Sequence, residues 1–191
     1  NGVGGKNHHH DHSFELTVPE LRKAGYSIEQ CVKAGFDITA IKAGGFDELQ
    51  LVQCGLFTSR QLLRAGCDIQ RYVLRTFYDS LDGRHWRHHE NWCTTKPLSE
   101  WYGVKVDSFG SVIAIDLRSN ELFGSLPEAL YLMTSLQSLD LSNNNLEGEF
   151  PTSYQQLQNL KDLWLDRNPA FARQVTKAQI QQLLPSCRIR I

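Results

Sequence analysis

The 191-residue sequence has almost no net charge and no long apolar run. Its 20 Lys and Arg balance 21 Asp and Glu, which leaves a formal net charge of -1 at pH 7. A chain without a basic excess has no overall field to hold nucleic acid or an anionic membrane, so neither partner is expected. The longest uncharged apolar-rich run, residues 129–136, is far shorter than the ~20 residues that span a bilayer, so no membrane insertion is expected. The 41% of hydrophobic residues suffices for an ordinary globular core.

Cysteine is sparse and shows no pairing pattern. The five cysteines are odd in number and far apart, and no Asn-x-Ser/Thr acceptor for glycans occurs. Both observations disfavour a secreted protein held together by disulfides. We therefore expect an intracellular protein, in the cytoplasm or an organelle. The chain begins at Asn1 rather than Met, so the lack of a targeting peptide carries no weight.

Signatures of catalysis are also missing. The glycines do not cluster into a phosphate-binding loop, and no Ser or Cys stands in a nucleophile-elbow context. Asp79, Asp82 and His85 lie together in sequence, but a helix end and a turn favour these residue types, and no nucleophile or second base accompanies them. We expect no enzyme activity, no catalytic residue, no cofactor and no small-molecule substrate.

The N-terminal residues 1–15 combine glycines with a His-rich tract from His8 to His12. Imidazole and the carboxylate of Asp11 suit a transition metal. The neighbouring glycines supply no rigid geometry, so we interpret the segment as a flexible, solvated tail without a metal site. A metal-binding tail and an irregular expression tag stay open as alternatives.

A ten-residue repeat occupies residues 16–67. Glycines recur from Gly25 to Gly66 as helix stops, and each precedes a residue that can cap the next helix. These caps are Ser27, Asp37, Asp47, Thr58 and Asp68. An apolar residue four positions after each cap gives every helix one buried stripe, and helices this short must stack to be stable. Four aromatic residues are expected in the core of this array, namely Phe36, Phe46, Phe57 and Tyr72.

A second repeat, of twenty-four residues, begins at Val112. Asn120, Asn144 and Asn168 occupy equivalent positions, and each closes a Leu-x-x-Leu-x-Leu-x-x-Asn run in which Val or Ile can replace Leu. This pattern is typical of leucine-rich repeats. The sequence therefore predicts an α/β solenoid, in which an all-helical repeat array precedes a short leucine-rich repeat solenoid with a parallel sheet of about four strands. The three asparagines are expected to be buried and to satisfy the backbone of neighbouring turns.

Two further features carry a closer family resemblance. The Gly-x-Leu/Phe-Pro elements at residues 124–127 and 148–151 resemble the plant-type subclass of leucine-rich repeats. The Trp-rich residues 68–111 resemble the N-terminal cap of that family, a helix and a Trp-x-Gly-Val hairpin that cover the first repeat. The cap of extracellular plant members has paired cysteines, whereas here Cys93 stands alone and Val106 occupies the second position. The chain also resembles predicted proteins of algae and other protists, in which Ala-Gly-Phe helical repeats precede the same domain.

The last domain, residues 112–191, is expected to contain the repeats and a C-terminal cap. Extending the twenty-four-residue repeat by one more unit places Leu184, Cys187 and Ile189 in a fourth strand after a helical cap. This register sets Ser186 beside Asp162 and Arg188 beside Trp164.

The concave face of this sheet is the candidate binding surface. The leucines and isoleucines of each strand point into the core, so the intervening residues point to the concave face. Trp164 is the candidate anchor, since an exposed Trp beside charges suits an interface. The charged candidates around it are Asp116, Arg118, Asp140, Asp162, Asp166, Arg188 and Arg190. These charges could instead only pair with one another across strands.

Together these features predict a non-catalytic protein-protein interaction module, an adaptor or a structural subunit of a larger multiprotein assembly. It is expected to bind another protein or a multisubunit complex through the concave face and the helical array. The alternative is an extracellular recognition or inhibitor protein with leucine-rich repeats, which requires oxidised cysteines or attached glycans. A purely architectural role inside a complex also stays open.

Overall fold

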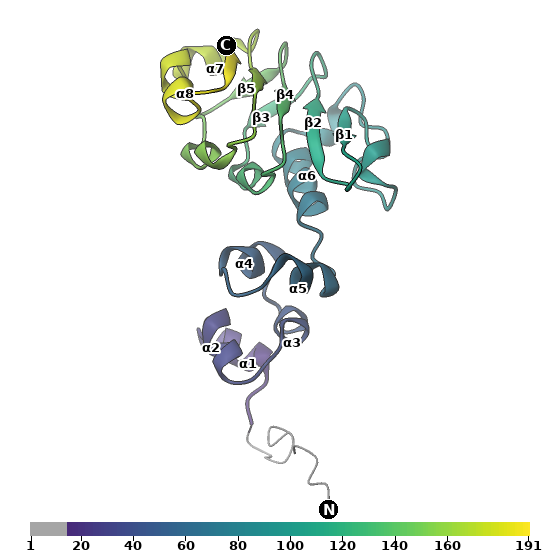
Figure 1. The fold of residues 1–191 in the computed structure, drawn as a ribbon, viewed down its shortest axis with the longest axis vertical. Helices are drawn as coiled ribbons and strands as arrows, with labels where there is room; N and C mark the ends of the chain where they lie inside the picture. Colours follow the sequence, from purple (N-terminus) through teal and green to yellow (C-terminus); the bar gives the residue numbers. More distant parts are fainter. Residues whose placement is uncertain (1–14) are drawn as a thin grey trace, which may run out of the picture. The chain divides into compact units, whose positions relative to one another are not determined.

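The computed structural model describes residues 15–191, which fall into two compact units on either side of the Asp68–Ile69 bond. The two units are drawn in Figure 1 and are described separately here. The His-rich tract that the sequence analysis interpreted as a flexible tail lies outside the described residues.

Five six-residue helices make up the first unit (Figure 1). They are α1 (Val18–Lys23), α2 (Ile28–Lys33), α3 (Ile38–Ala43), α4 (Glu48–Gln53) and α5 (Ser59–Arg64). In α2 to α5 the N-cap side chain accepts a hydrogen bond from the backbone N–H three residues on, and the glycine that ends each turn has a positive φ. Local sequence therefore sets where each helix begins and ends.

The core of the first unit is narrow, with about one fully buried side chain from each helix, such as Cys31, Ile41 and Leu51. The expectation that four aromatics fill this core is wrong for most of them. Phe46 is buried, but Phe36 and Phe57 are only half-buried. Phe36 and Phe46 both directly follow a helix-closing glycine with a positive φ, so the position within the repeat does not decide the burial of the ring. Tyr72 lies in the second unit, where it packs half-buried against that core.

The second unit is a solenoid built on one curved sheet. Helix α6 (Ile69–Ser80) begins it, and the sheet has the order β1-β2-β4-β6-β7. Figure 1 labels α6 and the first three of these strands. Strands β2 (Val112–Asp116), β4 (Ser138–Asp140), β6 (Asp162–Trp164) and β7 (Arg188–Arg190) are parallel, and β1 (Val104–Val106) is antiparallel to β2. After each parallel strand the chain crosses over on the other side of the sheet before the next strand begins, because parallel neighbours need a crossover connection.

Short elements form that opposite, convex side. Strands β3 (Phe123–Ser125) and β5 (Asn145–Glu147) pair in parallel as a second, small sheet, and 3₁₀ helices η4 (Glu128–Leu132) and η5 (Thr152–Gln156) follow them. Helix α6 packs against η4, while α7 (Pro169–Gln174) packs on β5 and α8 (Lys177–Leu183) on η5. The strand leucines are buried between the two sides in one continuous core.

The first strand of the solenoid is covered by a tryptophan cluster. Trp86, Trp92 and Trp101 are buried, with successive ring centres 4.9 and 5.3 Å apart, and 3₁₀ helices η2 (Gly83–His85) and η3 (Leu98–Glu100) flank them. Each indole N–H donates to a backbone carbonyl, so the rings are buried without an unpaired donor. The cap is therefore closed by packing, without a disulfide.

The register of the last strand differs from the predicted one. Asp162 pairs with Arg188 and Trp164 pairs with Arg190, two residues further on than the twenty-four-residue period predicts. Helices α7 and α8 lengthen the last unit, and the two added residues keep Ile189 on the buried face. Leu184 and Cys187 are buried as expected, but they precede the strand rather than belong to it.

Candidate functional site

Because side chains alternate between the two faces of each strand, two rows of side chains lie across the concave face. The backbone pairing aligns one row through Lys105, Ala114, Ser138, Asp162 and Arg188. The second row runs through Asp116, Asp140, Trp164 and Arg190. Sequence reasoning missed Lys105, because the antiparallel strand β1 lies outside the repeat pattern. The residues between these positions on each strand are buried, which turns both rows to the surface.

Trp164 is half-buried in this surface because Arg190 covers it. The guanidinium carbon of Arg190 lies 3.9 Å from the centre of the Trp164 ring, a cation–π contact. Leu163 and Leu165 on either side are fully buried, so the backbone holds the indole on the concave side. The pair forms a flat aromatic and cationic patch at the C-terminal end of the sheet.

A second basic residue beside this patch is engaged with an acid. Arg188 Nε lies 2.7 Å from Asp162 Oδ1, although its N–H is not aimed at that oxygen, so the contact is an ion pair without an aligned hydrogen bond. Asp162 also affects the buried thiol of Cys187. Burial raises the pKa of Cys187 to about 11, the negative charge of Asp162 adds to the rise, and Arg188 opposes it.

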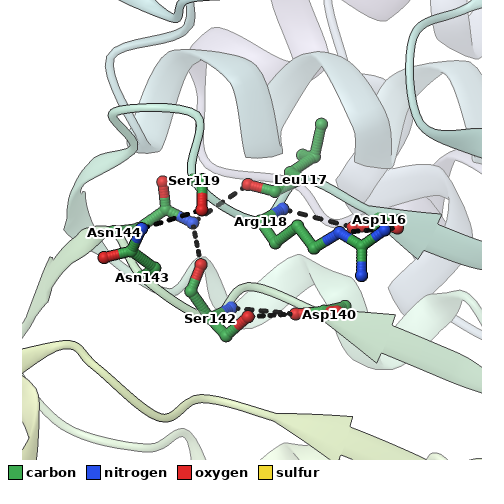
Figure 2. A network of polar contacts seen from close by, with 8 residues as sticks. All are labelled: Asp116, Leu117, Arg118, Ser119, Asp140, Ser142, Asn143 and Asn144. Atoms are coloured by element: carbon green, nitrogen blue, oxygen red, sulfur yellow. Dashed lines mark hydrogen bonds and ion pairs between the residues drawn. The ribbon is translucent and has the colours of Figure 1, made fainter.

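The acids in the middle of the sheet are held locally. Asp116 accepts a 3.3 Å hydrogen bond from the backbone N–H of Arg118, and its other oxygen lies 3.6 Å from the guanidinium of the same Arg118. Asp140 accepts from both the backbone N–H and the hydroxyl of Ser142, at 3.0 and 2.7 Å (Figure 2). Asp140 has no basic partner in the part of the chain that the structure describes, and is thus open to a cationic group from outside.

Asp166, unlike Asp162, has no ion pair among residues 15–191. Its Oδ1 atom is buried and has no hydrogen-bond partner among residues 15–191. A carboxylate oxygen removed from water without a donor is costly, so a donor from a partner would stabilise it. The eight predicted site residues lie on β2, β4, β6 and β7 or directly after β2 and β6. Acidic and basic residues are mixed along these strands, since Asp162 and Asp166 lie on or after the strand of Trp164 and Arg118 follows β2.

The repeated asparagines are structural. The Asn144 amide donates to the carbonyls of Leu117, Leu141 and Ser142 and accepts from the backbone N–H groups of Asn120 and Leu122. Figure 2 shows the Asn144 amide turned toward the carbonyls of Leu117 and Ser142. Asn168 repeats this arrangement, and all three asparagines are buried. The hydrogen bonds account for these residues without a ligand.

The histidines of the cap form isolated pairs. His85 lies 2.8 Å from Asp82 and His88 lies 3.1 Å from Glu90, both at exposed positions. A backbone hydrogen bond and the contact with His88 lower the pKa of Glu90. Among residues 15–191 no group of three or more His, Cys, Asp or Glu side chains is arranged to hold a metal ion. Within the same residues, no helix has the length and apolar character needed to cross a membrane.

The family comparison matches the middle of this solenoid. The model that describes the leucine-rich repeat matches residues 135–157, which include β4, β5 and η5. Residues 135–157 form a leucine-rich repeat. No catalytic family is matched, and a comparison with characterised protein sequences finds no match. Leucine-rich repeats stack into solenoids whose concave face binds proteins.

A comparison with solved structures finds proteins with leucine-rich repeats. The Arabidopsis receptor kinase HAESA, in complex with the peptide hormone IDA and the co-receptor SERK1, is 21% identical over 64% of this chain, with a TM-score of 0.50. The BIR3–SERK2 complex of Arabidopsis thaliana is 28% identical over 62% of this chain, with a TM-score of 0.48. A leucine-rich repeat protein of Leptospira interrogans is 38% identical over 40% of this chain, with a TM-score of 0.35. This chain spans 21%, 65% and 18% of those chains respectively, and the HAESA match shows the fold of the repeats.

Proposed function

We propose that this protein is a non-catalytic binding module that holds a protein partner on the concave face of its leucine-rich repeats, as an adaptor or as a subunit of a larger assembly. The observation that carries the proposal is the Trp164–Arg190 stack on that face. Trp and Arg dominate interface energetics, because a flat ring buries much area and a guanidinium combines stacking with hydrogen bonds. Arg190 already orders the ring, which lowers the entropy lost on binding.

Charge indicates which groups of the partner meet this face. Asp140 on β4 and Asp166, two residues after Trp164, supply acidic groups, and Asp166 Oδ1 has no donor among residues 15–191. Arg190 forms the basic part, since it faces a ring rather than a carboxylate. A partner segment with a basic group near Asp140 or Asp166 and an apolar or acidic group over the Trp164–Arg190 stack complements both charges.

The test is a cross-linked pull-down from the native source. Wild-type protein is compared with Trp164→Ala and with Phe109→Ala, a matched control that removes a 91% exposed ring from the β1–β2 turn. We expect Trp164→Ala to lose a defined set of partners that Phe109→Ala retains. Unchanged partners with a correctly folded Trp164→Ala protein would show that the concave face is not the binding surface.

We also propose an intracellular, reducing location, supported by the five free cysteines of the structure. Counting thiols in the denatured native-source protein tests this. Five free thiols agree with the proposal. One free thiol and two disulfides would favour the extracellular recognition or inhibitor protein instead.

A further inference from the structure

The convex side of the solenoid changes its construction at the last unit. Between the inner repeats η5 packs on η4, and the hydroxyl of Tyr154 donates to the Pro127 carbonyl at 2.6 Å. In the last unit α7 and α8 take the place of a third 3₁₀ helix, and the paired residues Asp162 and Arg188 are two positions further apart than the repeat predicts. A cleft of about 720 Å³ lies where the two arrangements meet, between residues 155–160 and residues 182–187.

This cleft combines an apolar floor with exposed amides. Leu157 and Leu184 are buried and form the floor, while Leu183 is half-buried and Pro185 is exposed. The exposed amides belong to Gln155, Gln156, Gln158 and Gln182. Among the described residues that line the cleft, none is charged and none is aromatic. We name it the amide cleft.

The four amides have no partner within the described part of the chain, since none of them donates or accepts a hydrogen bond among residues 15–191. The neighbouring glutamines of α8 differ. Gln179 accepts from the backbone N–H of Thr176 at 2.8 Å. Gln181 donates to the carbonyls of Leu184 and Cys187 at 2.9 and 3.0 Å. An amide side chain is both donor and acceptor, so each unpaired amide can bond to the N–H or to the C=O of a peptide group.

The sequence around the cleft indicates an uncharged ligand. Residues 150–160 and 178–187 contain no Asp, Glu, Lys or Arg, although 21% of the whole chain is charged. Seven of the thirteen glutamines lie in residues 155–182. A face that only needs hydration usually mixes both signs of charge, whereas amides here replace charges. A charged ligand would find no counter-charge in the lining, and a flat ring would find no aromatic side chain to stack on.

We propose that the amide cleft binds an extended, uncharged segment of a partner protein through the backbone of that segment. Gln156 lies on η5 and Gln182 on α8, so amides reach the segment from two walls and pair with its N–H and C=O groups. Every second side chain of an extended segment points the same way, and these contact Leu183 and Pro185. The inference goes beyond the proposed function, because the cleft lies beside η5 on the convex side and shares no residue with the concave-face candidates.

The test uses the full chain and a defined probe. Because the backbone is recognised, the generic capped peptide acetyl-Thr-Val-Thr-Val-Thr-Val-amide suffices, and it is titrated into ¹⁵N-labelled protein. We expect saturable shift changes in the four side-chain amides and in the backbone amides of residues 155–160 and 182–187. The same peptide with N-methylated backbone nitrogens keeps its side chains but loses its donors, so it should bind at least about tenfold more weakly. Equal binding of both peptides, or no shifts in these segments, would overturn the proposal.

Substitution of the glutamines gives the matched comparison. Gln156→Ala with Gln182→Ala removes one amide from each wall, so affinity for the parent peptide should fall at least about tenfold. Gln137→Ala removes another exposed glutamine that does not line the cleft, and it should bind like wild type. All three positions are exposed, so the urea midpoints should stay near that of wild type. If the double variant binds the peptide as tightly as Gln137→Ala, the glutamines do not bind the backbone. Trp164→Ala should leave peptide binding unchanged even where it abolishes the partners of the concave face.

Discussion

Arg190 lies over the Trp164 ring at 3.9 Å, and this contact couples β6 to β7 at the C-terminal end of the sheet. An exposed cation–π pair of this kind contributes about 0.5–1 kcal/mol. A double-mutant cycle of Trp164→Ala and Arg190→Ala, followed by urea denaturation, should give a coupling energy in that range. The control is Arg118→Ala, which loses an exposed ion pair and should not couple to Trp164→Ala. Equal coupling in both cycles would show that Arg190 does not stack on the ring in solution.

The Asn144 side chain satisfies five backbone groups of two adjacent repeats. Asn144→Ala leaves buried donors and acceptors unpaired, each at a cost of about 1–3 kcal/mol, so we expect the free energy of unfolding to fall by about 3 kcal/mol or more. Asn143→Gly is the matched control. Asn143 is exposed and its φ of 54° is one that Gly readily adopts, so the change should stay within about 1 kcal/mol. Similar losses in the two variants would contradict the structural role of Asn144.

Gly103 directly precedes β1 and has a φ of +76°, and a Cβ at this position would clash with the Asp116 carbonyl oxygen. Gly110 has a similar φ of +80°, but nothing lies within 4 Å of a Cβ there. Ala at either position pays the left-handed strain of roughly 1–2 kcal/mol. Gly103→Ala should lose about 1–3 kcal/mol more, because it also overpacks against backbone. Thermal unfolding of both variants measures the difference, and equal melting temperatures would show that the hairpin approaches β2 less closely.

The Cys187 thiol should be unreactive in the native state. Its pKa of about 11 keeps it protonated at pH 8, and the thiolate is the nucleophile. Iodoacetamide at pH 8, followed by mass spectrometry, should label the half-buried Cys54 well before Cys187. Early labelling of Cys187 would show that α8 opens easily.

The same thiol affects stability at high pH. The folded state holds its proton more tightly than the unfolded state, so the unfolded state loses the proton first as the pH rises. The contribution of Cys187 to stability is therefore complete below the unfolded pKa of about 8.5 and is lost as the pH rises toward 11. Cys187→Ala should make the urea midpoint less sensitive to pH between 9 and 11. If the substitution changed the pH dependence of the urea midpoint below pH 8 instead, titration of Cys187 would not be the cause.

Local sequence was sufficient for the helix ends of the first unit. Ser27, Asp37, Asp47 and Thr58 cap their helices through bonds to residues three positions away, and such short-range contacts do not depend on the rest of the fold. The burial of Phe36 and Phe57 could not be predicted in this way. It depends on how many neighbours surround each ring, which the repeat does not specify, since Phe46 is buried at the position equivalent to Phe36.

The sequence by itself determined the caps, the alternation of the strands and the role of the repeated asparagines, because each follows from a period and a local hydrogen bond. Only the tertiary structure decided that Arg190, rather than Arg188, lies beside Trp164, since α7 and α8 shift the last strand by two residues. It alone also placed Lys105 on the concave face and Gln156 and Gln182 along one cleft. These relationships join residues far apart in sequence, and they arise from packing, which no repeat period specifies.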